Sequence, residues 1–78
     1  MQVKVLGAGC GNCHTLQDRA NEALRQVGAP PTAELITDYA VIAGYGVMNT
    51  PALVVDDQVV AAGRIPSVAE LVTLLTRG

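Results

Sequence analysis

A Cys-x-x-Cys motif between two segments of different periodicity is the feature that most constrains this chain. Residues 2–6 alternate β-branched and polar side chains, which is typical of a short strand. After the turn Gly7-Ala8-Gly9 comes Cys10-Gly11-Asn12-Cys13, and residues 12–27 carry apolar side chains at helical spacing. The sequence therefore predicts a strand, a tight turn and a helix, with both cysteines where the turn becomes the helix.

Turn-forming residues divide the rest of the chain into further short elements. Gly28 and two prolines end the first helix, and Asp38 is placed to cap a second. Ser67 and Glu70 have the spacing of a capping box, followed by the apolar side chains of Leu71, Val72, Leu74 and Leu75. The predicted elements are strands over 2–6, 33–37, 52–55 and 59–62, a hairpin turn over 56–58, and helices over 12–27, 39–43 and from 67 onward. The order βαβαββα predicts an α/β fold with a four-stranded mixed sheet flanked by helices.

Length and composition restrict the classes of function. With 78 residues, half of them hydrophobic, we expect one domain over residues 1–78 with a single core. A net charge of −2 and the absence of Trp and Phe argue against nucleic-acid binding. The longest uncharged stretch, residues 39–55, is interrupted by glycines and a proline, and no secretory signal precedes the first glycine. We expect a cytoplasmic protein with no membrane or nucleic-acid partner.

The position of the two cysteines favours redox chemistry. Cys10 is expected beside unpaired N–H groups and the positive end of the helix dipole, which both favour a thiolate over a thiol. Cys13 follows one helical turn later, close enough to attack a mixed disulfide formed at Cys10. The sequence therefore predicts Cys10 as the attacking thiol and Cys13 as the resolving thiol.

Haem attachment is one alternative, because His14 completes the pattern C-x-x-C-H and Met48 is available as an axial ligand. Such a site needs an exported chain and a large apolar pocket, which this composition does not favour. The simpler interpretation of His14 is an exposed residue in the first helical turn, and that of Met48 is a packing residue.

Metal handling is a second alternative, since two thiolates at the end of a first strand can bind copper or zinc. Metal-carrying domains of this size usually run βαββαβ and end on a strand, whereas this chain is expected to end on a helix. A non-enzymatic metal-binding or metal-relay module using the same two thiolates remains open at this point.

Nucleotide binding and a purely structural use of the cysteines are two further alternatives. Residues 3–9 look like the start of a dinucleotide-binding unit, but the third glycine of that motif would fall at Asn12. Buried, inert cysteines are disfavoured because Gly9 and Gly11 have no side chains that could shield the motif from solvent. The glycines are better interpreted as allowing a tight turn that exposes Cys10.

Pro51 supplies the second motif, at the first residue of an apolar run, where a strand accepts proline readily. The chain then resembles the thioredoxin superfamily, in particular its small bacterial and archaeal redox-active disulfide proteins of glutaredoxin size. The matching segments are residues 3–6, 9–13, 45–55 and 63–67. The resemblance implies a cis Thr50–Pro51 bond against the disulfide, and substrate binding at Thr50, Pro51 and Gly63 by strand addition.

The resemblance implies a thiol-disulfide oxidoreductase acting on protein disulfides through catalytic Cys10 and Cys13. We expect no cofactor and no metal, a separate disulfide reductase as electron donor, and a monomer. Thioredoxins usually have Trp where this chain has Gly9, and a buried acid in the first strand, where this chain has only Lys4. Cys13 must therefore lose its proton through water or His14.

Overall fold

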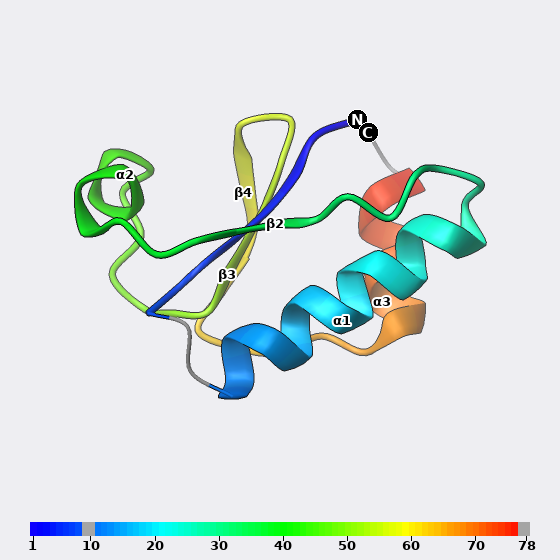
Figure 1. Cartoon of the computed structure of the whole chain (residues 1–78), viewed down its shortest axis with the longest axis horizontal. Helices are drawn as coiled ribbons and strands as arrows, with labels where there is room; N and C mark the ends of the chain where they lie inside the picture. Colours follow the sequence, from blue (N-terminus) through cyan, green and yellow to red (C-terminus); the bar gives the residue numbers. More distant parts are fainter. Residues whose placement is uncertain (9–10, 77–78) are drawn as a thin grey trace.

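The computed structural model describes residues 1–8 and 11–76 and contains one four-stranded sheet (Figure 1). The strands are β1 (Val3–Leu6), β2 (Glu34–Ile36), β3 (Ala52–Val55) and β4 (Gln58–Ala62), in the order β2-β1-β3-β4. β1 pairs with β2 in parallel, whereas β3 is antiparallel to both β1 and β4. The predicted four-stranded mixed sheet is confirmed.

Three helices alternate with the strands: α1 (Gly11–Gln26), α2 (Tyr39–Gly44) and α3 (Val68–Thr76). The element order is the predicted βαβαββα, and the observed boundaries lie within one residue of the predicted ones. The hairpin turn differs slightly, because Gln58 pairs with Val55 and opens β4 instead of belonging to the turn. Figure 1 shows α1 and α3 side by side below the sheet, with α2 at the far end of the sheet.

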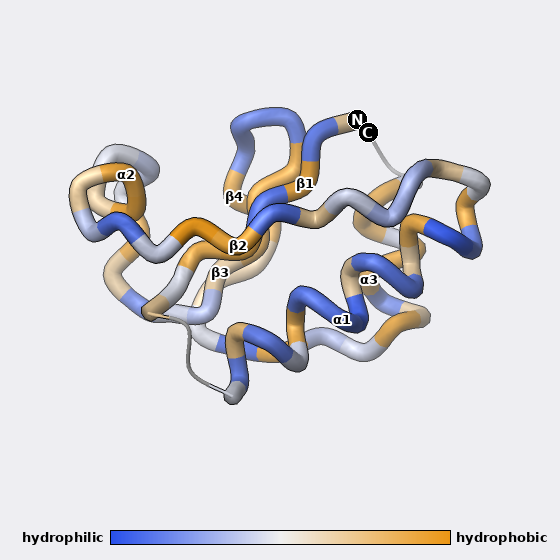
Figure 2. Tube along the Cα trace, in the orientation of Figure 1, coloured by the Kyte–Doolittle hydropathy of each residue, from blue (hydrophilic) through white to orange (hydrophobic). Residues whose placement is uncertain are grey.

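Alternation along the strands separates two apolar clusters, one on each face of the sheet. Figure 2 shows the strands coloured largely as hydrophobic. Val3 and Val5 of β1 face α1 and α3, while Leu6 faces α2, as the period of two along a strand requires. The larger cluster contains Val3, Val5, Cys13, Leu16, Ala20, Ala23, Leu24, Ala33, Leu53, Ala61, Leu71 and Leu75. The smaller cluster contains Leu6, Ile42, Ala52 and Val54. Cys13 therefore belongs to the main core.

Polar side chains of α1 attach the helix to the segment that leads into β2. The Asn21 Oδ1 accepts a hydrogen bond from the Ala33 N–H at 2.8 Å, and the Gln17 Nε2 donates to the Ala33 carbonyl at 3.0 Å. At the end of α1, the Ala29 N–H donates to the Leu24 carbonyl and the Gly28 N–H to Arg25, with Gly28 at φ 78°. This is a Schellman motif, which explains why a glycine ends the helix.

The start of α3 differs from the predicted capping box in one half. The Ser67 Oγ accepts a hydrogen bond from the Glu70 N–H at 3.2 Å, as predicted. The Glu70 carboxylate is not bonded to the Ser67 N–H in the described part of the chain, and pairs with the guanidinium of Arg64 at 2.6 Å. The nearby cation competes successfully for the carboxylate because a charged partner makes the stronger bond.

No helix within residues 1–8 and 11–76 is both long and apolar enough to cross a bilayer.

Candidate active site around Cys13

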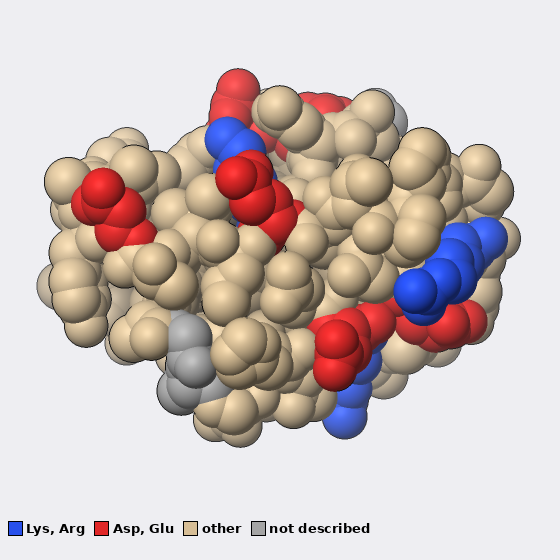
Figure 3. Space-filling view, viewed as in Figure 1, with Lys and Arg blue, Asp and Glu red and all other residues tan. Residues whose placement is uncertain are grey.

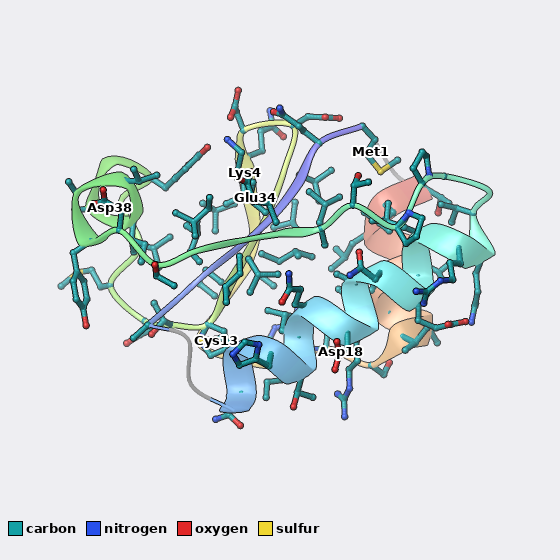
Figure 4. The ribbon with its side chains drawn as sticks, in the orientation of Figure 1. Met1, Lys4, Cys13, Asp18, Glu34 and Asp38 are labelled. Atoms are coloured by element: carbon teal, nitrogen blue, oxygen red, sulfur yellow. The ribbon has the colours of Figure 1, made fainter. Side chains whose placement is uncertain are left out.

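Cys13 lies in the first turn of α1 with its side chain fully buried, at 0% exposure. It occupies the same helix face as Leu16 and Ala20, which pack beneath it in the main core. Figure 4 marks it at the beginning of α1, where the helix approaches the sheet. The predicted partner, Cys10, lies outside the described residues, so the distance between the two sulfur atoms stays untested.

Gly7 brings the end of β1 against Cys13. A Cβ atom on Gly7 would collide with the Cys13 Sγ, and it would lie 3.8 Å from the Thr50 Cβ. The Cys13 and Thr50 side chains therefore both lie on the side of Gly7 where a side chain would begin. The end of β1 and the start of α1, which are close in the sequence, converge here with the distant loop before β3.

Thr50 and Pro51 are joined by a cis peptide bond, in agreement with the resemblance to thioredoxins. Pro51 is buried and Thr50 is exposed. The Gly63 N–H donates to the Pro51 carbonyl at 2.9 Å, and Gly63 has φ 74°, a conformation that favours glycine. The structure thus brings together three predicted site residues, Thr50, Pro51 and Gly63, and places the first of them beside Cys13.

A family model described as a thioredoxin domain matches residues 1–76. The chain belongs to the thioredoxin family. Among its relatives, a thioredoxin of Methanothermobacter thermautotrophicus is 32% identical over 76 residues, covering 97% of this chain and 99% of that protein. A thioredoxin of Methanocaldococcus jannaschii is also 32% identical, over 69 residues that cover 88% of this chain and 79% of that protein. Membership of the thioredoxin family implies thiol–disulfide exchange with protein disulfides in general.

Lys4, which stands in the first strand where thioredoxins usually have a buried acid, lies on the sheet face opposite Cys13. Its Nζ donates to the Tyr45 hydroxyl at 3.3 Å, and that hydroxyl donates to the Asp57 carboxylate at 3.0 Å. The hydrogen bond from Lys4 to Tyr45 raises the pKa of the lysine. Lys4 therefore links β1 to Tyr45, the residue after α2, on the sheet face away from the Cys13 thiol.

His14 and Met48, the two residues named for haem or proton transfer, are both exposed. The exposed position of His14 in the first turn of α1 was predicted. The prediction that Met48 packs in the core is wrong, since its side chain is 95% exposed. The loop from α2 to β3 places this apolar residue in solvent, while Ile42 and Val47 cover the small cluster in its place.

The start of α1 is uncharged. On the face shown in Figure 3, the acidic and basic residues gather over the sheet and further along α1, and Asp18 is the first Asp, Glu, Lys or Arg in the helix. Within residues 1–8 and 11–76 no cluster of three His, Cys, Asp or Glu side chains has a geometry that could hold a metal ion. A charged thiolate at this end of the helix would meet no acidic neighbour from the first turn of α1.

Two residues of the site were not singled out by the sequence analysis. Gly7 was interpreted only as part of a tight turn, although its contact with Cys13 depends on the missing side chain. Asn49 lies against Gly63, where an added Cβ would approach the Asn49 Cβ to 3.0 Å. The available signal for Gly7 was its place directly after a buried strand, where a glycine marks a close approach of another part of the chain.

Proposed function

We propose that residues 1–78 form a single thioredoxin-like domain that exchanges electrons with protein disulfides through a dithiol of Cys10 and Cys13. The observation that supports this most directly is the position of Cys13. Its sulfur is buried at the start of α1, next to Thr50 of the cis-proline loop, in a chain of the thioredoxin family. This position supports a reaction of Cys13 with a second thiol that precedes the helix in the sequence.

Cys10 is the proposed nucleophile, because in the sequence it immediately precedes Gly11, the first residue of α1. The N–H groups of a first helical turn have no partners within the helix and carry partial positive charge. They therefore stabilise a thiolate beside them, and the thiolate is the reactive form of cysteine. The absence of acidic residues from the first turn of α1 leaves this effect unopposed there.

The proposed reaction has two exchange steps. The Cys10 thiolate attacks one sulfur of the substrate disulfide, the substrate S–S bond breaks, and the departing substrate thiolate takes up a proton. The Cys13 thiolate then attacks the Cys10 sulfur, a Cys10–Cys13 bond forms, and the second substrate thiolate leaves and is protonated. The substrate gains two electrons and the protein dithiol loses two. A separate disulfide reductase returns them by exchange at the same cysteines, without a cofactor in this chain.

Substrate binding is proposed at Thr50, Pro51 and Gly63. Thr50 and Gly63 are exposed on either side of the buried Pro51, and the bond from Gly63 to Pro51 fixes their relative position. Arg19 supports the loop that contains Gly63, because its guanidinium donates to the carbonyls of Ile65 and Pro66. An extended segment of the substrate would pair with the backbone before Pro51, which requires little of the substrate's side chains.

Trapping of mixed disulfides tests the proposal. Cys13→Ser should retain substrates at Cys10 as stable mixed disulfides, since the second step is blocked, whereas Cys10→Ser should retain far fewer. Both variants are compared with wild type in the same lysate after acid quenching and alkylation. Equal trapping by the two variants would contradict the assigned roles, and trapping by neither would contradict the exchange reaction.

Metal analysis separates exchange from metal binding. The wild-type protein is purified without chelator, and its zinc and copper content is measured together with the mass gained on alkylation under denaturing conditions. We expect two alkyl groups to be added only after reduction, and metal far below one ion per chain. Stoichiometric zinc or copper that is lost in Cys13→Ser would favour a metal-binding module instead.

A further inference from the structure

Gly7 follows the last residue of β1 and is buried, with its backbone fixed by the sheet. Its N–H donates to the Ile36 carbonyl at 2.9 Å, which continues the pairing of β1 with β2 by one residue. The described glycines with a positive φ are Gly28, Gly46 and Gly63, so the backbone conformation at Gly7 does not require glycine. Another property of the position must explain the missing side chain.

The space in which a side chain would begin is filled by Cys13. A Cβ on Gly7 would collide with the Cys13 Sγ, lie 3.4 Å from the Cys13 Cβ and 3.8 Å from the Thr50 Cβ. The first of these contacts is incompatible with any residue other than glycine unless the sulfur moves. The other two are a tight contact and an ordinary van der Waals contact, so the conflict concerns the sulfur atom itself.

We propose that Gly7 is a positioning residue for the resolving thiol: its missing side chain seats the Cys13 sulfur beside Thr50, in the place from which it attacks the mixed disulfide at Cys10. This inference rests on the function proposed above for Cys10 and Cys13. Gly7 takes no part in the exchange of bonds and acts only through the position of Cys13.

An alanine at position 7 would displace the sulfur and not the surrounding backbone. The backbone of residue 7 is held by Ile36 of β2, and α1 is held to the segment before β2 through Asn21. Rotation of the Cys13 side chain about its χ1 angle moves the sulfur without a shift of the backbone. A displaced sulfur loses the alignment that the second exchange step needs, and a shift of about 1 Å can slow a reaction by ~10²-fold.

The two exchange steps should respond differently, and 5,5′-dithiobis(2-nitrobenzoic acid) measures each of them. Attack by Cys10 on this disulfide releases one thionitrobenzoate, and resolution by Cys13 releases the second. In reduced Gly7→Ala, with one equivalent of reagent, we expect the first release within about twofold of wild type and the second slowed by about 10- to 100-fold. Gly44→Ala is the matched control, because a Cβ there meets no heavy atom within 4 Å.

A double-mutant cycle tests the contact independently of the reaction. The loss of unfolding free energy caused by Gly7→Ala is measured by urea denaturation of the reduced protein, in the wild-type background and in Cys13→Ala. We expect the loss to fall by more than half in Cys13→Ala, where the sulfur is gone. If Gly7→Ala alone does not fold, Cys13→Ala should restore folding.

Several results would overturn the inference. Equal destabilisation in both backgrounds would show that Gly7 does not act through the Cys13 sulfur, and so would a second release as fast as in wild type. Equal slowing of both releases would indicate a general structural defect. A wild-type protein that gives no second release would overturn the proposed function, and with it this role for Gly7. This would hold even if the double-mutant cycle still showed that Gly7 and Cys13 are in contact.

Discussion

The guanidinium of Arg64 and the carboxylate of Glu70 form an ion pair, with 2.6 Å between Arg64 Nη2 and Glu70 Oε2. The pair joins the residue after Gly63 to the first turn of α3, and both side chains are about half exposed. The hydrogen bond and charge of Arg64 lower the pKa of Glu70 below its ordinary value. Because solvent screens exposed pairs, its contribution to stability is small.

The Arg64–Glu70 pair predicts a pH dependence of stability. The pKa of Glu70 is lower in the folded protein than in the unfolded chain, so the stabilisation is present above the unfolded pKa and disappears as the pH falls through the folded pKa. We expect the melting temperature of wild type to exceed that of Glu70→Gln at neutral pH, with the difference shrinking as the pH falls through the folded pKa of Glu70. In an Arg64→Gln background the difference between Glu and Gln at position 70 should not depend on pH in this way.

Asn21 is expected to contribute more to stability than its polar character suggests. Asn21→Ala leaves the part-buried Ala33 N–H without its acceptor, which should lower the unfolding free energy by about 1–2 kcal/mol after the gain in helix propensity. Gln26→Ala, which removes only an exposed hydrogen bond of the same helix, should change it by less than about 0.5 kcal/mol. Urea denaturation measures both, and Asn21→Asp should recover part of the loss because it keeps an acceptor. Equal effects of the two alanine variants would contradict this interpretation.

Two glycines at helix ends should respond oppositely to alanine. Gly28 has φ 78° and nothing within 4 Å of an added Cβ, so Gly28→Ala should cost about 1 kcal/mol through backbone strain alone. Gly44 closes α2 without a positive φ, so Gly44→Ala should be neutral or stabilise the protein by up to about 1 kcal/mol. Thermal or urea unfolding measures the stability of each variant relative to wild type. A stabilising Gly28→Ala would show that the Schellman motif does not depend on glycine.

Leu53 and Met48 are two large apolar residues of adjoining segments. Their replacement by alanine should have a large effect on stability at Leu53 and almost none at Met48. Leu53 is fully buried in β3, and Leu53→Ala should lower the unfolding free energy by about 2–5 kcal/mol by opening a cavity. Met48 is 95% exposed, so Met48→Ala should change stability by less than about 0.5 kcal/mol. A large loss in Met48→Ala would mean that this side chain is covered in solution.

Most of the fold was predicted from the spacing of apolar residues along the sequence. The alternation in β1 and the helical spacing of Leu16, Ala20 and Leu24 depend on one buried face per element, which is a local property of the sequence. Gly28 likewise marked the end of α1 through a local backbone requirement. Periodicity does not reveal which charged side chains will pair, and the carboxylate of Glu70 binds Arg64 of the preceding loop where the sequence suggested only a cap.

The candidate site was predicted unevenly for the same reason. Pro51 was identified because its place at the start of a strand is readable from the sequence, and its cis bond agrees with the family resemblance. The role of Gly7 could not be read in this way, since a glycine that makes room for a sulfur of the next helix has the same sequence context as one that only forms a tight turn. The exposure of Met48 also escaped prediction, because an uncharged run does not reveal which of its apolar residues lack a partner.

The complete burial of Cys13 makes this residue an internal reporter of conformational opening. A reagent in solution cannot reach a sulfur at 0% exposure without a local or global opening of the fold. In Cys10→Ser, where Cys13 is the remaining cysteine, the labelling rate of this sulfur therefore measures how often the contact between the α1 start and the sheet breaks. A single chromophoric thiol reagent would then measure the rate of local opening under native conditions, without denaturant.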